Sequence, residues 1–209
     1  MLTAHYDSTP LSCGSYDNMT GSIGILGVAE RFMKAPHKRG LRFIWCGAEE
    51  LGLLGSKDYC AKHEGELEKV ILNINLDMIG SIMGKFIACC SAEDRLVSFL
   101  EYTADETGFP IAARTGVYSS DSTPFADKGV PSLSFARLAP PTAGSIHERY
   151  DTPAIVSPKQ VVADTEFIAD FTGHMANAVR CPVKREIPET IKEKLDVYLN
   201  RKRPPKPQD

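Results

Sequence analysis

The chain has 209 residues, of which 43% are hydrophobic and 24% charged, and its formal net charge is -3 at pH 7. This length and composition suit one globular domain with a sizeable core. The charged residues build no basic field for nucleic acid, and no apolar run approaches the roughly 20 residues of a membrane span. We therefore expect neither a nucleic-acid partner nor a membrane partner.

The first residues already carry groups that are typical of a functional site. Met1–His5 resembles the end of a strand, and His5-Tyr6-Asp7 follows directly. This predicts that part of the fold, including a neighbouring strand or two, precedes Met1. The segment Met1–Ala4 lacks the basic start and apolar middle of a signal peptide, so the chain as given is expected in the cytoplasm, although a missing N-terminal segment would hide such a signal.

The next elements alternate between strand and helix. Asp17-Asn18 lies where a helix N-cap would lie, and apolar residues at helical spacing follow from Ile23 to Phe32. The apolar runs Arg42–Cys46 and Val70–Ile79 predict strands on either side of a helix at Ser56–His63. A strand, a helix and a strand in this order favour a parallel crossover unit.

The remaining elements continue this pattern. We expect a strand at Lys85–Cys90, a helix at Asp94–Thr107, a short helix near Ser122–Lys128, a strand at Pro131–Phe135 and a closing helix within Ser157–Arg180. The predicted fold class is α/β, with a mainly parallel mixed sheet flanked by helices on both faces. Residues 1–182 form the predicted catalytic domain, and residues 183–209 a charged helix around Thr190–Asn200 with a disordered Pro-rich tail.

The stretch from Gly47 to Ser56 is the centre of this organisation. Its adjacent carboxylates, Glu49 and Glu50, follow an apolar strand and precede a helix, so they lie at the edge of a core. Two unpaired charges at that place would cost several kcal/mol per ion. A bound metal ion is the simplest way to neutralise them.

Other acidic and imidazole residues also fall where predicted strands end or loops begin. They are His5 with Asp7, Asp17, Asp77 and His147. Each has a simpler interpretation: His5 as a hydrogen-bonded core histidine, Asp17 and Asp77 as caps, and His147 as a loop residue. Because the carboxyl ends of parallel strands share one edge, these side chains together predict a single metal site.

Six segments taken in order make this hypothesis more specific. They are His5-Tyr6-Asp7-Ser8, Asp17-Asn18-Met19-Thr20-Gly21, Ala48–Ser56, Asn75–Gly80, Ser120-Asp121 and His147-x-x-x-Asp151-Thr152. This set resembles the motifs of the M28 family of zinc metallopeptidases, which includes bacterial leucyl-type aminopeptidases, related carboxypeptidases and glutaminyl cyclases. The resemblance implies a zinc-exopeptidase (phosphorylase/hydrolase-like) fold. The family's region ahead of the first histidine has no counterpart here, which again predicts N-terminal truncation.

The resemblance also implies a role for each residue. His5 and Asp77 would hold one Zn²⁺, Glu50 and His147 a second, and Asp17 would bridge the two. Asp7 would accept the ring N–H of His5, and Asp151 would do the same for His147. Glu49 would be the general base for the attacking water, which the metals activate. Apart from the resemblance, Tyr118 stands just ahead of Ser119-Ser120-Asp121, where its phenol would donate to the tetrahedral intermediate; an ordinary buried or surface tyrosine is the simpler interpretation.

The function that follows is a zinc-dependent exopeptidase acting on peptides, in first place an aminopeptidase. A one-zinc, glutaminyl-cyclase-like acyltransferase and an inactive, peptidase-like binding module are the alternatives. The choice between amino- and carboxypeptidase stays open, because Arg137 and Arg149 lie near His147 in the sequence and offer partners for a substrate carboxylate. Side-chain preference, the metal used in vivo and homo-oligomerisation are open as well.

Overall fold

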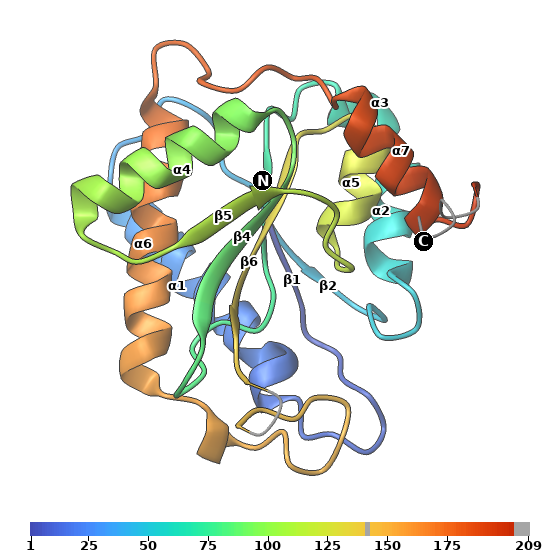
Figure 1. The fold of residues 1–209 in the computed structure, drawn as a ribbon. Helices are drawn as coiled ribbons and strands as arrows, with labels where there is room; N and C mark the ends of the chain where they lie inside the picture. Colours follow the sequence, from blue (N-terminus) through green and yellow to red (C-terminus); the bar gives the residue numbers. More distant parts are fainter. Residues whose placement is uncertain (141–142, 203–209) are drawn as a thin grey trace, which may run out of the picture.

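A six-stranded sheet forms the centre of the computed structural model, which describes residues 1–140 and 143–202 (Figure 1). The strand order is β2-β1-β3-β6-β4-β5. The strands are β1 (Leu2–His5), β2 (Phe43–Cys46), β3 (Asn73–Leu76), β4 (Lys85–Ser91), β5 (Ala112–Thr115) and β6 (Ser132–Leu138). All neighbouring strands pair in parallel except β4 and β6, which are antiparallel. The predicted mainly parallel mixed sheet is confirmed.

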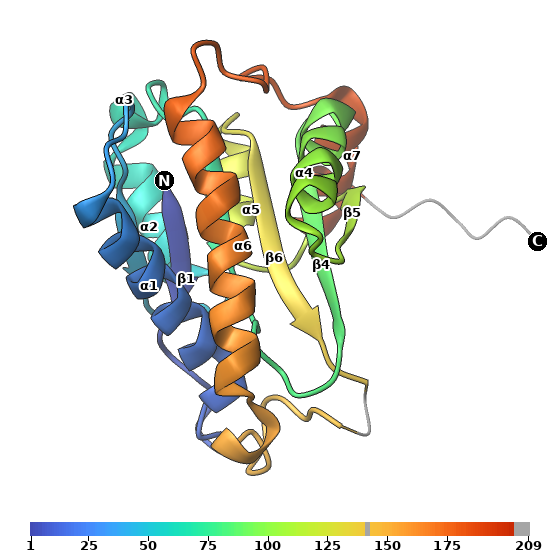
Figure 2. The ribbon, with the colours of Figure 1, turned by 90° about the vertical axis from the view of Figure 1, so that its left-hand side faces the viewer.

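Helices cover both faces of the sheet. One face carries α1 (Thr20–Lys34), α4 (Asp94–Thr107) and α6 (Pro158–Asn177), and α6 lies beside α1 (Figure 2). The other face carries α2 (Leu54–Lys62), α3 (Glu64–Leu67), α5 (Ser122–Asp127) and α7 (Glu189–Tyr198). Because the central strands are covered on both faces, even their polar residues, such as Asn73, Asn75 and Ser134, are buried.

The main core lies between the sheet and the first of these helix layers. Phe86 of β4 and Phe135 of β6 stack with their ring centroids 5.5 Å apart, and Phe167 of α6 meets both rings edge-on. Such aromatic pairs add about 0.5–1.5 kcal/mol each beyond the area they bury. A smaller cluster, with Phe125 and Cys60, fills the opposite face. The sheet is therefore a rigid platform for residues at its edges.

The register of the central strands brings their carboxyl ends to one edge. His5 of β1 lies opposite Cys46 of β2, the last residue of that strand. Thr3 lies opposite Asn75 of β3, so two residues further along His5 is level with Asp77. Residues that end three different strands thus start from the same edge of the sheet.

The structure departs from the sequence-based expectations in several places. Strand β3 ends at Leu76, before the expected Ile79, because Met78 adopts a left-handed φ of 64° that interrupts an extended strand. Strand β5 was missed, since Ala112–Thr115 contains no run of large apolar residues. The predicted Pro-rich tail falls on residues 203–209, which lie outside the described part. Within residues 1–140 and 143–202, no helix is long and apolar enough to cross a bilayer.

Candidate metal centre

The predicted ligands come from five separate segments at the carboxyl-end edge of the sheet. His5 ends β1, Glu50 follows β2, Asp77 follows β3, and His147 lies in the loop after β6. Asp17 lies in the segment Ser15–Met19, directly ahead of α1, where Asp17 and Asn18 have non-helical backbone angles and the peptide bond between them is cis. The structure brings all five side chains together.

The first group is buried and consists of His5, Asp17 and Asp77. Nε2 of His5 lies 3.2 Å from Oδ1 of Asp17 and 3.5 Å from Oδ1 of Asp77. Nδ1 of the same ring lies 3.1 Å from the backbone oxygen of Asp7, which can only accept a hydrogen bond. The proton of a neutral His5 ring therefore lies on Nδ1, and the lone pair of Nε2 points toward the carboxylates, as a metal ligand requires.

The second group shares Asp17 with the first. Nε2 of His147 lies 3.2 Å from Oδ2 of Asp17 and 2.9 Å from Oε2 of Glu50. Within each group the potential ligand atoms all lie within 4.8 Å of one another. Because the two oxygens of Asp17 face different groups, this carboxylate is placed to bridge two cations. The second group is the more open one, since the side chain of His147 is 51% exposed.

The donor set fits zinc. Imidazole nitrogens and carboxylate oxygens are ordinary zinc ligands, and three protein ligands per ion leave a position for water or substrate, as in catalytic sites. Among the described residues, Oδ1 of Asp77 and Oε1 of Glu50 are buried and find no hydrogen-bond donor. Buried carboxylate oxygens without donors are expensive, and a divalent cation would satisfy them.

The electrostatics of the cluster favour a positive charge. Burial raises the pKa of Asp17, and burial together with the charge of Asp17 raises that of Glu50. Burial opposes a charge on His5, but the carboxylates of Asp17 and Asp77 outweigh it and raise the pKa of the ring to about 12. The ionised carboxylates repel one another, and a divalent ion held between them would relieve that repulsion.

The backbone beside the ligands is held in an uncommon conformation. Ala48, Met78 and His147 all have left-handed φ angles, of 55°, 64° and 61°. Ala48 precedes the two glutamates, Met78 follows Asp77, and His147 is itself a candidate ligand. Non-glycine residues seldom adopt this region, and such strain of about 1–3 kcal/mol per residue concentrates at functional sites.

Asp7 supports the site through a different contact from the one we predicted. Its carboxylate lies 3.7 Å from Nδ1 of His5, too far for a hydrogen bond, and its backbone oxygen takes that place. The two carboxylate oxygens instead accept the backbone N–H groups of Glu49 and Glu50, at 3.1 and 3.2 Å. Asp7 thus fixes the loop that carries the glutamates. The bend at Glu49 and Glu50 leaves their N–H groups without backbone partners, and the Asp7 carboxylate accepts them. The sequence motif alone does not show this bend.

Asp151 departs from its predicted contact in the same way. Its Oδ1 accepts the backbone N–H of Tyr16 at 2.6 Å, and its Oδ2 accepts that of Asp17 at 3.0 Å. No ion pair between Asp151 and His147 occurs in the part of the chain that the structure describes. Asp151 is fully buried, so it orients Asp17 through the backbone and does not orient the His147 ring.

The substitution Asp151→Asn should therefore weaken metal binding without removing a ligand. An amide nitrogen cannot accept the second backbone N–H, so that group stays unpaired at a cost of about 1–3 kcal/mol. Loss of such an outer contact lowers metal affinity about 10–100-fold. Zinc titration against a competing chelator would measure this, with Asp58→Asn on the exposed side of α2 as the control. Zinc affinity equal to that of the unmodified protein would contradict the assigned role.

Sequence reasoning missed a chain of two hydrogen bonds that ends at Asp77. Asn75 donates from Nδ2 to Oγ of Ser120 at 2.7 Å, and Ser120 donates to Oδ2 of Asp77 in a short hydrogen bond. Oδ2 is thereby occupied, and Oδ1 is left facing His5. Ser120 belongs to the segment Ser120-Asp121, but the sequence assigns it no role, because the partner of a serine is known only once the fold is known.

Asn18, next to the bridging aspartate, was also undervalued. Its Oδ1 accepts the backbone N–H groups of Gly21 and Met78, both at 3.0 Å, and its Nδ2 donates to the oxygen of Leu76. Asn18, one position before the N-cap Met19, therefore accepts an N–H group of the first turn of α1, and it ties the start of α1 to the end of β3. Asp17 is left free to face the two histidines.

The candidate ligands line a cavity of about 480 Å³. Its lining also includes Glu49, which belongs to neither ligand group, and Tyr118. Burial and the negative charge of Asp77 raise the pKa of Glu49 to about 8. Burial also raises the pKa of Tyr118, so its phenol keeps its proton and remains a hydrogen-bond donor.

Arg137 and Arg149, the predicted partners for a substrate carboxylate in a carboxypeptidase, are not among the residues that line this cavity. Arg137 donates from Nη2 to Asp164 at 2.6 Å and from Nη1 to the oxygen of Gly84 at 2.9 Å, and the pair is almost fully buried. Arg149 stacks over Tyr150 and donates to its hydroxyl group. Among the described residues that line the cavity, none is a lysine or an arginine.

An α/β sheet that presents two carboxylate and imidazole groups sharing one aspartate defines a protein with a candidate dinuclear metal centre. The family model described as "Peptidase family M28" matches residues 1–172. This chain belongs to that family.

Relatives agree with this assignment. Aminopeptidase YwaD from Bacillus subtilis is 37% identical over 158 residues, which are 73% of this chain and 34% of the relative. The solved structure of BSAP, a zinc aminopeptidase from Bacillus subtilis, matches with a TM-score of 0.76 and 29% identity, over 91% of this chain and 49% of that one. A glutaminyl cyclase from an Acidobacteriales bacterium shares the fold, with a TM-score of 0.69 and 22% identity, over 82% of this chain and 67% of that one. This chain thus spans about a third of the curated relative and about half of the solved aminopeptidase.

Proposed function

We propose that the chain is a zinc-dependent exopeptidase, and specifically an aminopeptidase that hydrolyses the N-terminal peptide bond of its substrate. The observation that carries this proposal is the pair of ligand groups joined by Asp17 in one cavity with the uncommitted carboxylate of Glu49. The similarity to zinc aminopeptidases supports it.

In this proposal each group of the chain has a distinct task. His5, Asp17 and Asp77 would hold one Zn²⁺, and Asp17, Glu50 and His147 the other. Bound zinc would lower the pKa of the attacking water and polarise the scissile carbonyl. Glu49 takes a proton from the attacking water and later donates it to the leaving amine, and Tyr118 donates a hydrogen bond to the developing oxyanion.

The charge of the cavity favours an aminopeptidase over a carboxypeptidase. A carboxypeptidase must bind the free carboxylate of its substrate, for which arginine offers two parallel hydrogen bonds. Arg137 is already paired with Asp164, and the described lining contains acidic residues without any lysine or arginine. Such a cavity receives an α-ammonium group better than an α-carboxylate.

Two alternatives remain distinguishable by experiment. A glutaminyl-cyclase-like acyltransferase would need one zinc, whereas the two complete ligand groups favour two. An inactive binding module would need neither the carboxylate of Glu49 nor a full set of metal ligands. Glu49 and all five candidate ligands line one cavity, which favours an enzyme.

Metal analysis paired with a panel of free and N-blocked dipeptides tests the function. We expect about two Zn²⁺ per chain and hydrolysis of the free dipeptides, with N-acetylated dipeptides untouched because they lack the ammonium group. Full metal loading with no hydrolysis of any peptide would contradict a peptidase. Cyclisation of N-terminal glutamine at one zinc per chain would establish the acyltransferase instead.

A further inference from the structure

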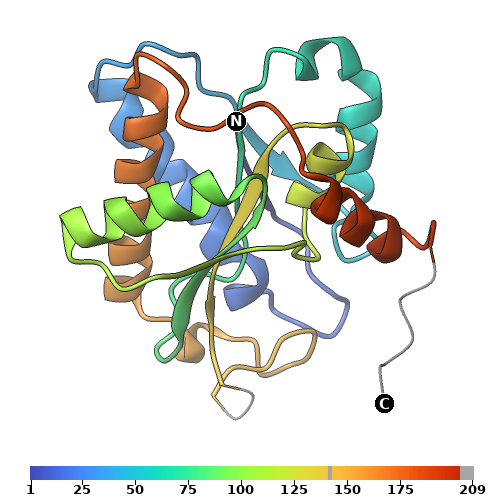
Figure 3. The same cartoon turned by 45° about the horizontal axis from the view of Figure 1, so that its top comes forward.

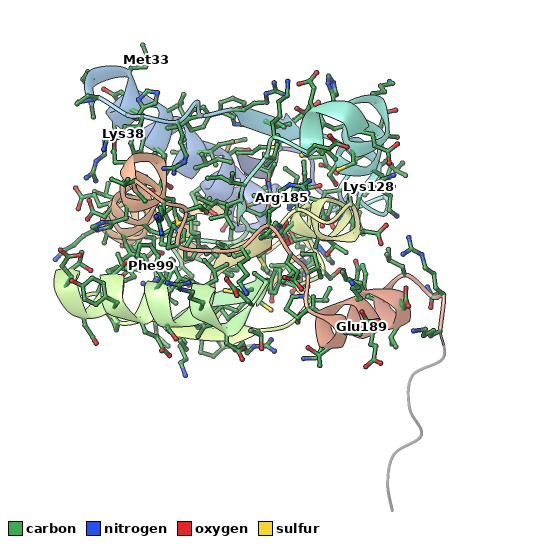
Figure 4. The ribbon with its side chains drawn as sticks, turned by 90° about the horizontal axis from the view of Figure 1, so that it is seen from above. Met33, Lys38, Phe99, Lys128, Arg185 and Glu189 are labelled. Atoms are coloured by element: carbon green, nitrogen blue, oxygen red, sulfur yellow. The ribbon has the colours of Figure 1, made fainter. Side chains whose placement is uncertain are left out.

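Helix α7 lies beyond the residues that the family model matches, yet it is firmly attached to the domain. The linker between α6 and α7 passes over the amino ends of the strands (Figure 3). Arg185 in this linker donates to the backbone oxygens of Leu67 and Val70, at 2.9 and 3.2 Å. Val183 is buried in the main core. Figure 4, seen from above, labels Arg185 in the linker and Glu189 at the start of α7.

Two further contacts fix the direction of α7. Ile191 and Leu195 are buried against Ala126 of α5, and both nitrogens of the Arg201 fork bind Asp127, at 2.6 and 2.7 Å. Bidentate pairs of this kind fix geometry as well as adding energy. The helix therefore runs from the amino ends of the strands toward the carboxyl-end edge, where the metal ligands lie (Figure 1).

The last turn of α7 reaches the candidate active site. Tyr198 lines the same cavity as the ligands, and its hydroxyl group lies 2.7 Å from Oγ of Ser119, in the loop that also carries Tyr118. Tyr198 is the one described residue of α7 in that lining. With its hydroxyl group held by Ser119, the ring can offer its apolar face to the cavity.

We propose that Tyr198 is a specificity-determining residue, whose ring contacts the side chain of the substrate's first residue. This inference rests on the proposed aminopeptidase function. Besides Tyr198, the cavity lining includes Leu53, Tyr118 and Ile146, and these side chains form its apolar wall. The substrate class is therefore peptides with a large apolar or aromatic first residue, which bury that side chain against this wall.

Binding of amino-acid hydroxamates tests this role without requiring turnover. A hydroxamate anchors at the metal end, so phenylalanine hydroxamate reaches the wall and glycine hydroxamate does not. Titration calorimetry of the zinc-loaded Tyr198→Ala protein should show roughly tenfold weaker binding of the phenylalanine compound, as expected for lost apolar contact, and less than about twofold change for the glycine compound. Tyr198→Phe, which keeps the ring, should stay within about threefold of the unmodified protein for both compounds.

Controls keep this inference separate from the proposed function. Tyr102→Ala, on the exposed surface of α4, should leave both affinities unchanged. Equal losses for both hydroxamates, or no loss, in Tyr198→Ala would overturn the role of Tyr198. The unmodified protein could prefer the phenylalanine compound through Tyr198 and yet hydrolyse no dipeptide. That result would overturn the aminopeptidase function and support the role of Tyr198.

Discussion

Replacing Glu49 by Gln is expected to lower kcat for aminoacyl anilides by about 10²–10⁴-fold, the usual contribution of a general base. Glutamine has nearly the same shape as glutamate but cannot take a proton from water. Glu49 belongs to neither ligand group, so the variant should keep its two Zn²⁺. Steady-state kinetics combined with metal analysis of the same preparation would measure both quantities.

The neighbouring glutamate provides a matched control. Glu50 lies 2.9 Å from Nε2 of His147 and belongs to the second ligand group, so Glu50→Gln should lose one zinc as well as activity. The backbone N–H groups of both glutamates bind the same Asp7 carboxylate, and both variants keep these groups, so the loop is held alike in each. Full turnover in Glu49→Gln would refute the role of Glu49 as general base. Loss of zinc from Glu49→Gln but not from Glu50→Gln would refute the assignment of Glu50, and not Glu49, as the ligand.

Asp17→Asn is expected to remove both metal ions together. The two oxygens of Asp17 face His5 and His147, at 3.2 Å each. An amide offers one oxygen and one N–H₂ donor, so it cannot bridge two cations. We expect zinc affinity to fall more than about 100-fold, which exceeds the usual effect of losing a residue that only hydrogen-bonds to a ligand. We also expect peptidase activity to fall to background. Equilibrium dialysis followed by elemental analysis would measure the metal content.

The stability of the metal-free variant separates ligand loss from misfolding. Burial and the charge of Asp77 both raise the pKa of Asp17, although His5 opposes them, so its ionised form is costly without a cation. Removing that charge should leave the metal-free protein no less stable in urea. Asp58→Asn, whose carboxylate pairs with Lys62 on the exposed face of α2, is the control. An Asp17→Asn protein that keeps two Zn²⁺ would disprove the bridging role.

The contacts of Asp7 and Asp151 explain how residues on loops are held in place at the candidate site. Each carboxylate accepts two backbone N–H groups of the segment that carries a ligand or the proposed base. Backbone positions held in this way restrict every side chain that they carry, which is the preorganisation that catalysis needs. The two aspartates therefore act on the positions of Asp17, Glu49 and Glu50 and not on the imidazole rings.

The sequence by itself determined the fold class and the composition of the candidate site. Apolar runs ending in carboxylates or imidazoles predicted a parallel sheet with its ligands at one edge, because side chains that end parallel strands must converge there. His5, Asp77 and Glu50 could be chosen in this way, since each lies at or near the end of an apolar run that predicts a strand. Strand β5 escaped, since its sequence is Ala-Ala-Arg-Thr, without the apolar run that marks a buried strand.

Only the tertiary structure decided which atoms meet. Hydrogen-bond partners depend on where the backbone bends leave N–H groups exposed, and a local pattern contains no such information. The fold therefore pairs Asp151 with the N–H of Asp17, Ser120 with Asp77, and Asn18 with the first turn of α1. It also carried Tyr198 into the cavity, because the packing of α7 against α5 joins segments that are distant in the sequence.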